Sequence, residues 1–395
     1  MISSLFLHKP EVLLTGSCTQ ALEMCALLLG LSPGDEVIVP AFTFVSSANP
    51  FLNVGATIRF ADVAADTLCV TTDTIRPVLS ARTKAVVVVH YAGFECDVTA
   101  IRQLLDDFQV EHELNSRIRI IEDAAHALGA RGSGGTRLGS RGDLACFSFH
   151  ATKNAVAGEG GALVVNDTAL SDAARICWEK GTNRHDFLRG RVDRYAWVAP
   201  GGSFGPSELT AAFLLPQLRA VHRICRYRVW VWNKYYRKLS PLERAGRLRL
   251  PPFLATEDVT FGLGWDETEL PPRETTEQLR LIQPAHPGHI FWILLPTADI
   301  AQHMAAFARQ RNVALCSHYV PLTTSPLGRQ LRAKTPAVSD DCCVAESVAP
   351  RLLRLPLWFG LTDENIKHVV EVVEEGVASA IANNLYDGVL GHTLE

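Results

Sequence analysis

The apolar run at residues 84–90, KAVVVVH, limits what this chain can fold into more than any other stretch. It has no alternation of polar and apolar residues, which is typical of a parallel strand with both faces covered. Further strand-like runs are expected at residues 12–14, 37–39, 57–60, 119–121, 144–149 and 162–165. Helical segments alternate with these runs, for example at residues 98–108. The alternation predicts an α/β fold built on a doubly wound sheet.

Several of these runs are followed by a polar or aromatic side chain at the point where the strand ends. Phe44 comes shortly after the run at 37–39, Asp123 follows the run at 119–121, and Ser148 lies at the end of the run at 144–149. In doubly wound sheets, ligands bind beyond the carboxyl ends of the strands. The convergence of these separate segments therefore predicts a ligand site at that edge.

Lys153 lies in a polar turn between the runs at 144–149 and 162–165, close to Ser148 and before a glycine-rich stretch. A lysine held between two strands beside a hydroxyl suits the Schiff-base lysine of a pyridoxal phosphate (PLP) enzyme. Taken alone the feature is weak, because most lysines are solvated surface charges.

A second candidate feature is the segment TGSCT at residues 15–19, between the strand at 12–14 and a helix expected at 20–29. The N–H groups at the start of a helix have no intrahelical acceptor, and the helix dipole favours an anion there. An ordinary N-cap by Ser17 or Thr19 explains the same residues. The two interpretations are about equally supported by this segment alone.

The length of 395 residues allows one large and one smaller domain. We expect a large α/β domain at residues 1–225 and a small α+β domain at 226–395. A polar and aromatic loop at 181–206 and a long helix at 207–239 lead out of the first. The elements expected in the second are strands at 290–295 and 314–320, helices at 300–310, 345–354 and 364–382, a surface excursion near 251–287 and a frayed tail from 383.

The net charge of −4 gives no electrostatic case for binding nucleic acid or an anionic membrane. The basic cluster at 223–228 falls in an expected helix, where a solvated or interface face explains it. The ten cysteines show no metal-type spacing, so we expect no metal site and free thiols in a reducing compartment. No apolar run reaches membrane-spanning length, and a cytosolic enzyme is the expectation.

Six motifs in order resemble the DegT/StrS-type sugar aminotransferases, which are PLP enzymes of aminotransferase fold type I with a mostly parallel seven-stranded sheet flanked by helices. These motifs are TGSCTQALEM, PGDEVIVPAFTFVSSAN, HYAG, IEDAAHALGA, LACFSFHATKN with GEGGALVVND, and SELTAAFLLPQL. The segments KGTNRHDFLRGRVDRYAW, HYVPL and RLLRLPLW look like the branch that makes TDP-4-amino-4,6-dideoxygalactose (WecE-type). The resemblance is dense over residues 11–240 and looser beyond.

The resemblance implies roles for particular residues. Lys153 would hold PLP covalently and move the proton, and Asp123 would pair with the pyridine nitrogen. Without Lys153, Asp123 would be interpreted as a helix N-cap, and His126 and Phe44 could equally be core residues. The full set of implied cofactor contacts is Thr19, Gln20, Phe44, Asp123, His126, Ser148, Lys153 and, from the partner subunit, Ser203.

Substrates and partners are also implied. L-glutamate would give its amino group, by a ping-pong reaction through the pyridoxamine form, to C4 of a TDP-4-keto-6-deoxyhexose. Asn183, Arg184, His318 and Tyr319 are candidate contacts to the nucleotide sugar, because Arg binds pairs of phosphate oxygens. A solvated or dimer-interface loop explains the residues of 183–194 at least as well. A homodimer with sites at its interface is implied by the position of Ser203.

The chain departs from the resemblance in two places. Residues 1–10 do not match the longer segment that usually precedes the first motif, and the excursion near 251–287 is longer than expected for the branch. Two alternative functions stay open. A sugar dehydratase of the same family would carry histidine in place of Lys153, and a non-catalytic or regulatory relative would bind PLP or a nucleotide sugar without turnover.

Overall fold

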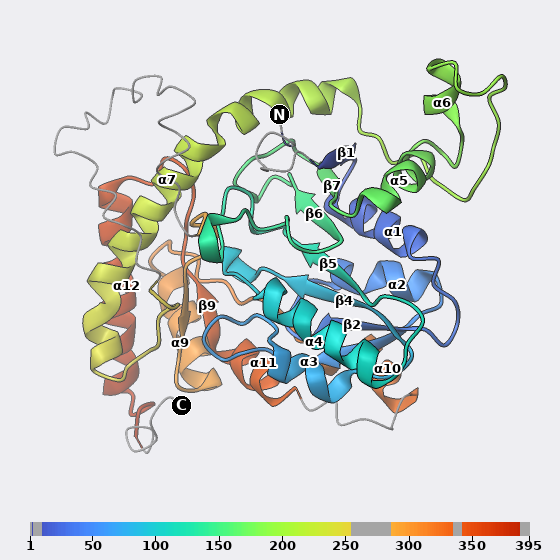
Figure 1. Cartoon of the computed structure of the whole chain (residues 1–395). Helices are drawn as coiled ribbons and strands as arrows, with labels where there is room; N and C mark the ends of the chain where they lie inside the picture. The colour runs from blue at the N-terminus through green and yellow to red at the C-terminus, as the bar shows by residue number, and fades with distance from the viewer. Residues whose placement is uncertain (1, 3–9, 254–285, 335–341, 388–395) are drawn as a thin grey trace.

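The computed structural model describes Ile2 and residues 10–253, 286–334 and 342–387, and its centre is a seven-stranded sheet (Figure 1). The strands in chain order are β1 (Glu11–Thr15), β2 (Glu36–Pro40), β3 (Thr57–Ala61), β4 (Thr83–Val89), β5 (Arg119–Asp123), β6 (Leu144–Ser148) and β7 (Gly161–Val165). In space they follow the order β1-β7-β6-β5-β4-β2-β3. β7 is antiparallel to both β1 and β6, and the other neighbouring pairs are parallel. The sheet confirms the expected fold class.

The strands are apolar throughout because both faces of the sheet are covered. In β6, Leu144 and Cys146 pack in the same core cluster as helix α1 (Cys18–Leu28). Ala145 and Phe147 point the other way and pack in a cluster with the first half of helix α7 (Glu208–Arg244). Successive side chains of a strand point to opposite faces, so neither set can be polar.

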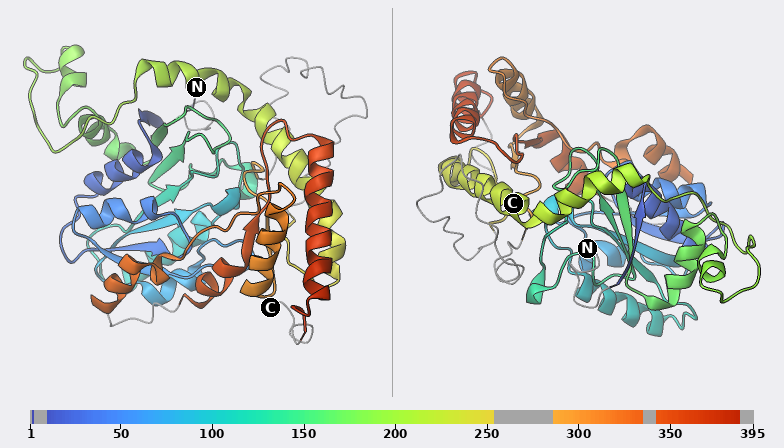
Figure 2. Two further views of the ribbon diagram at one scale, coloured as in Figure 1. Left: turned by 180° about the vertical axis from the view of Figure 1, so that it is seen from behind. Right: turned by 90° about the horizontal axis from the view of Figure 1, so that it is seen from above.

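Helices on both faces complete the layers, and Figure 2 shows α4 and α1 on opposite sides of the sheet. The remaining helices are α2 (Asn49–Asn53), α3 (Thr72–Ile75), α4 (Val98–Glu111), α5 (Ser171–Trp178), α6 (Arg184–Leu188), α9 (Ala298–Arg309), α10 (Pro326–Lys334), α11 (Cys343–Val348) and α12 (Asp363–Ala382). Helix α6 lies inside the segment that was expected to be a loop at 181–206.

A second, two-stranded sheet lies beside the main one. It pairs β8 (Trp292–Leu294) antiparallel with β9 (Leu352–Arg354). Helix α7 runs across the end of the main sheet and then down beside α12, which also packs against α9 (Figure 1). The expected domain boundary between residues 225 and 226 falls inside α7, and the division into two domains stays a prediction.

Two expected elements of the C-terminal part are wrong. Residues 314–320 form no strand; apart from one isolated bridge between Cys316 and Arg354, this segment turns into a cavity that lies against the main sheet. The helix expected at 345–354 ends at Val348, and β9 follows it after a short 3-10 turn. Pro350 contributes to the break, because it has no N–H to donate to the Glu346 carbonyl and so cannot continue the α-helix.

The glycine-rich segment at 132–135 forms a turn between Arg131 and Arg137, which are joined by an antiparallel bridge. Most of the expected excursion at 251–287, most of residues 1–10 and the last part of the expected frayed tail lie outside the described residues. Within the described residues, no helix combines the length and apolar character needed to cross a membrane. All ten cysteines are free thiols.

Candidate active site

A cavity of about 1280 Å³ opens beyond the carboxyl ends of β4, β5 and β6. Residues of the main sheet and its connections form one wall, and residues near β8 and β9 form another. Eight side chains named from the sequence line it together: Thr19, Phe44, Asp123, His126, Ser148, Lys153, His318 and Tyr319. Phe44, Asp123 and Ser148 therefore meet at one cavity, as their places at strand ends predict, and their contacts to a ligand stay predictions.

Asp123 is the last residue of β5, and hydrogen bonds fix the orientation of its carboxylate. Ser47 Oγ donates to Oδ2 over 2.7 Å, and the Ala125 N–H donates to Oδ1 over 3.1 Å. Ser47 also exchanges a hydrogen bond of 2.8 Å with Thr43 Oγ1, so its hydroxyl is held from both sides. Asp123 is only 6% exposed, and its carboxylate is thus presented to the cavity in one orientation.

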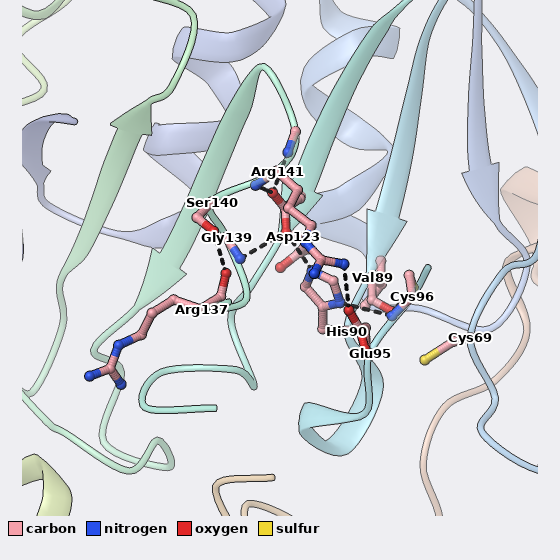
Figure 3. A network of polar contacts seen from close by, with 12 residues as sticks. Cys69, Val89, His90, Glu95, Cys96, Asp123, Arg137, Gly139, Ser140 and Arg141 are labelled. Carbon is pink, nitrogen blue, oxygen red and sulfur yellow. Dashed lines mark hydrogen bonds and ion pairs between the residues drawn. The ribbon is translucent and has the colours of Figure 1, made fainter. Parts of the chain in front are cut away.

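Glu122 precedes Asp123 on β5, where successive side chains point to opposite faces, and it bonds to His90, Gly139 and Arg141, which Figure 3 shows. Its carboxylate accepts hydrogen bonds from the N–H groups of Gly139, Arg141 and Gly142 at 2.7, 2.8 and 2.5 Å. His90 Nδ1 accepts the N–H of Cys96, so His90 Nε2 carries the proton and donates it to Glu122 over 2.8 Å. Burial alone raises the pKa of Glu122, but these hydrogen bonds outweigh it and lower the pKa.

Lys153 follows β6 in a tight turn whose backbone is closed by a hydrogen bond from its own N–H to His150 C=O, 2.9 Å long. The next side chain, Asn154, donates to Pro287 C=O over 2.8 Å and contacts His289 Nδ1 over 2.8 Å, so the turn is tied to the other wall. Burial lowers the pKa of Lys153, against the opposing charges of Cys18 and Asp123. A larger fraction of its amine is therefore neutral and nucleophilic at neutral pH.

The first turn of α1 borders the cavity and offers unpaired N–H groups. Ser17 is the N-cap: its Oγ accepts from Gln20 N–H over 3.1 Å, and its carbonyl accepts from Ala21 N–H. The N–H groups of Cys18 and Thr19 have no acceptor among the described residues. Thr19 Oγ1 lies 2.8 Å from Ser46 Oγ, on the same rim. The N-cap at Ser17 is confirmed, and an anion site beside it stays a prediction.

Three histidines surround this region and are kept neutral. The ring centroids of His126 and His289 are 4.5 Å apart, and those of His126 and His318 are 6.1 Å apart. Burial is the main reason why the pKa of each is lowered, in the case of His318 to about 2, and the charges of Lys153 and Arg354 act in the same direction. They add no positive charge to the cavity at neutral pH.

The remaining residues named from the sequence lie outside the lining of this cavity. Gln20 Oε1 accepts the Gly16 N–H over 2.9 Å, and its own N–H is used by Ser17. Asn183 closes its loop through Ala196 N–H and Arg194 C=O, and Arg184 pairs with Glu179. Ser203 is exposed and forms an isolated bridge with Glu179. Site roles for these four residues stay predictions.

Sequence reasoning missed several residues of the site. Ser47, the partner of Asp123, stands in the quoted motif VSSAN, and Arg354 in the quoted segment RLLRLPLW, yet neither was given a role. Cys18 and His289 also line the cavity. Among the described residues, no group of three or more His, Cys, Asp or Glu is placed to hold a metal ion.

Comparison with known proteins identifies the class to which this site belongs. The DegT/DnrJ/EryC1/StrS aminotransferase family matches residues 4–259 and 267–374. The chain belongs to this family. The enzyme is therefore a sugar aminotransferase, and its cofactor is PLP.

Individual relatives cover most of the chain. The spore coat polysaccharide biosynthesis protein SpsC of Bacillus subtilis is 27% identical over 387 residues, which are 95% of this chain and 87% of SpsC. The aminotransferase TlmJ from Streptoalloteichus hindustanus is 27% identical, with a TM-score of 0.77 over 96% of this chain and 90% of TlmJ. Spr1654 from Streptococcus pneumoniae, solved in a PMP form, shares the fold at 24% identity and a TM-score of 0.77 over 97% of this chain and 90% of its own.

The residues that line the cavity match the chemical groups of PLP. A phosphate needs N–H donors and hydroxyls, and the start of α1 with Ser148 offers both. A pyridine nitrogen needs a fixed carboxylate, and Asp123 is one. An aldehyde needs a nucleophilic amine, and Lys153 lines the same cavity with a lowered pKa.

Proposed function

We propose that this aminotransferase transfers the amino group of L-glutamate to the 4-keto group of a TDP-4-keto-6-deoxyhexose, as a WecE-type enzyme of deoxysugar biosynthesis in the cytosol. The observation that carries the proposal is the grouping of Lys153, Asp123 and the anion site of α1 around one cavity with an excess of positive charge. A sugar nucleotide and an amino dicarboxylate are both anions, which such a cavity attracts.

In this proposal, some residues of the chain bind the cofactor and one moves the proton. Thr19, the N–H of Cys18 and Ser148 hold the cofactor phosphate, and Asp123 pairs with the ring nitrogen. When bound, PLP supplies an electron-withdrawing ring that stabilises negative charge on the substrate carbon. Nζ of Lys153 anchors the cofactor and carries the proton to and from the substrate carbon that gains or loses nitrogen. Phe44 and His126, which line the cavity, flank the ring.

The neutral histidines serve this chemistry by keeping the site free of competing charge. His318 Nδ1 lies 3.1 Å from Tyr91 Oη, and Ala92 N–H donates to His126 Nδ1 over 3.3 Å. Both rings are thereby held in place in the lining of the cavity that contains Lys153. In the proposal, His318 and Tyr319 contact the sugar, where hydrogen-bonding groups without charge suit hydroxyls.

The proposal includes a homodimer in which Ser203 of one subunit reaches the phosphate bound by the other. The segment that carries α6 projects away from the rest of the chain (Figure 1). Apolar side chains are exposed on it and on the start of α7, with Trp197 at 79% and Leu209 at 83%. Exposed apolar groups of this kind are typical of surfaces that another protein covers.

The test is a complete reaction with purified protein, PLP, L-glutamate and TDP-4-keto-6-deoxyglucose. The expected result is equimolar 2-oxoglutarate and a nucleotide sugar whose mass shows an amino group in place of the keto oxygen. NMR of the product then locates nitrogen at C4. Release of 2-oxoglutarate without an amino sugar, or nitrogen at C3, would contradict the proposed acceptor. Loss of a hydroxyl without nitrogen gain would indicate the dehydratase alternative.

A further inference from the structure

The charges around the cavity do not balance. Four cationic side chains line it, Lys153, Arg223, Arg228 and Arg354, against two acids, Asp123 and Glu159. Arg228 is buried, and its guanidinium donates hydrogen bonds to the carbonyls of Gly288 and His289. Asp123 is held by Ser47 and Ala125, and Glu159 lies 3.5 Å from His150 at the exposed rim. The guanidinium of Arg223 lies over the ring of Phe359, 5.4 Å from its centroid. Arg354 has neither an anionic partner nor a ring contact of this kind among the described residues.

Arg354 is fixed in the fold by its backbone. It is the last residue of β9, where its C=O accepts from Cys316 N–H over 3.2 Å and its N–H donates to Cys316 C=O over 2.8 Å. Its side-chain Nε is buried and has no hydrogen-bond partner in the described part of the chain. A buried N–H without an acceptor costs free energy, which an anion bound to Nε would recover.

The charge of Arg354 acts on both walls of the cavity. It lowers the pKa of Lys153 and of His126 on one wall, and of His289 and His318 on the other. These groups surround the amine that handles the reacting carbon. Arg354 also lines the same cavity as Lys153, so an anion paired with Arg354 lies in the cavity where the amine acts.

Only one of the two proposed substrates has an anionic group next to its reacting carbon. An α-amino acid carries a carboxylate on the carbon that loses nitrogen, one bond away. The diphosphate of a nucleotide sugar is separated from C4 by the sugar ring. The planar fork of arginine matches the two oxygens of a carboxylate. Resting on the proposed function, we infer that Arg354 binds the α-carboxylate of the amino-acid donor.

Arg354→Gln tests this assignment, with Arg354→Lys as the conservative variant. Both half-reactions of a ping-pong enzyme have their own kcat/KM, so donor and acceptor are measured separately. For Arg354→Gln, kcat/KM for L-glutamate is expected to fall about 100-fold, and kcat/KM for the keto sugar to change less than about threefold. Arg354→Lys keeps the charge but loses the fork, and recovers part of the loss.

A comparison of L-glutamate with its α-amide shows which of the two glutamate carboxylates Arg354 contacts. The wild-type protein is expected to prefer L-glutamate to its α-amide by about 100-fold, and Arg354→Gln to use the two about equally. The control is Arg351→Gln, three residues earlier, where the guanidinium donates to the carbonyls of Ser347 and Pro296. Arg351→Gln is expected to change kcat/KM for L-glutamate and kcat/KM for the keto sugar by less than about twofold.

A binding measurement serves as a readout that does not depend on turnover. Glutarate has the carboxylates of the donor without its amine, and its affinity by calorimetry is expected to fall at least tenfold in Arg354→Gln. Equal glutarate affinity in both proteins, or a loss confined to the sugar constant, would overturn the inference. If the wild-type protein aminates no sugar, the proposed function fails, and the glutarate comparison still decides the role of Arg354.

Discussion

Ser47 Oγ donates a hydrogen bond of 2.7 Å to Oδ2 of Asp123 across 76 residues of chain. The contact joins the turn after β2 to the end of β5, at the edge where two parallel strands present their carboxyl ends. It leaves the carboxylate with one orientation toward the cavity. The hydroxyl of Ser47 therefore positions the group that is proposed to hold the ring nitrogen.

Replacement of this pair tests that relationship. Asp123→Asn is expected to lower kcat about 100-fold or more, because an amide cannot keep the ring nitrogen protonated. Ser47→Ala removes one hydrogen bond to a charged group, which corresponds to about 1.5 kcal/mol or roughly tenfold in kcat/KM. Ser140→Ala, whose hydroxyl donates only to Arg137 C=O over 2.6 Å, is the matched control. A Ser47→Ala protein with unchanged kinetics would show that Asp123 is oriented without it.

Glu122 gives an expectation for the pH dependence of stability. Its pKa is lowered in the folded protein by the hydrogen bonds that outweigh its burial. A carboxyl whose folded pKa lies below the unfolded value of about 4.3 stabilises the fold above that pH. This contribution is lost as the pH falls through the folded pKa.

The variant Glu122→Gln removes this contribution, and an amide cannot accept from His90 and three backbone N–H groups at once. We expect the variant to lose about 2–4 kcal/mol in the free energy of unfolding at pH 7. The difference from the wild-type protein should become smaller below about pH 4. Urea unfolding at a series of pH values measures it. Glu371→Gln, an exposed residue paired with Lys367, serves as the control. A loss that stays constant down to pH 3 would contradict the assigned charge of Glu122.

Gly161 determines how closely β7 approaches the start of α1. A Cβ at this position would overlap the carbonyl carbon of Ser17 and the N–H of Cys18, which are backbone atoms and cannot turn aside. Gly161→Ala is therefore expected to displace the first turn of α1 and weaken PLP binding at least tenfold in a spectroscopic titration. Gly246→Ala serves as the control: it strains only its own turn at φ +65°, with nothing within 4 Å of the new Cβ and outside the cavity lining, so its affinity should stay within about threefold. Equal affinities of the two variants would argue against a phosphate site at α1.

The dimer proposal is tested at the exposed apolar side chains near α6. We expect Trp197→Ser combined with Leu209→Lys to shift a dimer to a monomer in sedimentation experiments, since both changes remove apolar surface from the contact. Val110, which is 81% exposed on α4, offers a matched control as Val110→Ser. A wild-type protein that sediments as a monomer would exclude a partner role for Ser203.

Much of the main sheet and its site could be predicted from the sequence, because the signals there are local. The valines of β4 must be buried, and Asp123, Ser148 and Lys153 stand directly after short apolar strands. Parallel strands align their carboxyl ends, so these residues had to meet at one edge.

The other wall of the cavity could not be predicted in the same way. Cys316, His318 and Arg354 reach the cavity through the pairing of β8 with β9 and the bridge from Cys316, contacts between distant segments. Residues 314–320 have an apolar pattern like that of a strand, but within the described part of the chain their ladder pairing is limited to the bridge between Cys316 and Arg354. The helix predicted to run to residue 354 was also too long. Residues 352–354 pair with β8 instead, and this pairing prevails over their helix propensity.

The identity of the lysine that carries the cofactor is the central claim, and reductive trapping tests it most directly. The protein is loaded with PLP, reduced with borohydride and digested, and the labelled peptide is found by mass spectrometry. We expect the label on Lys153 in the wild-type protein and in Lys180→Ala, where only an exposed lysine paired with Glu179 is lost. Lys153→Ala should fold and carry no label. A label at another lysine in an active protein, or one retained in Lys153→Ala, would contradict the assignment.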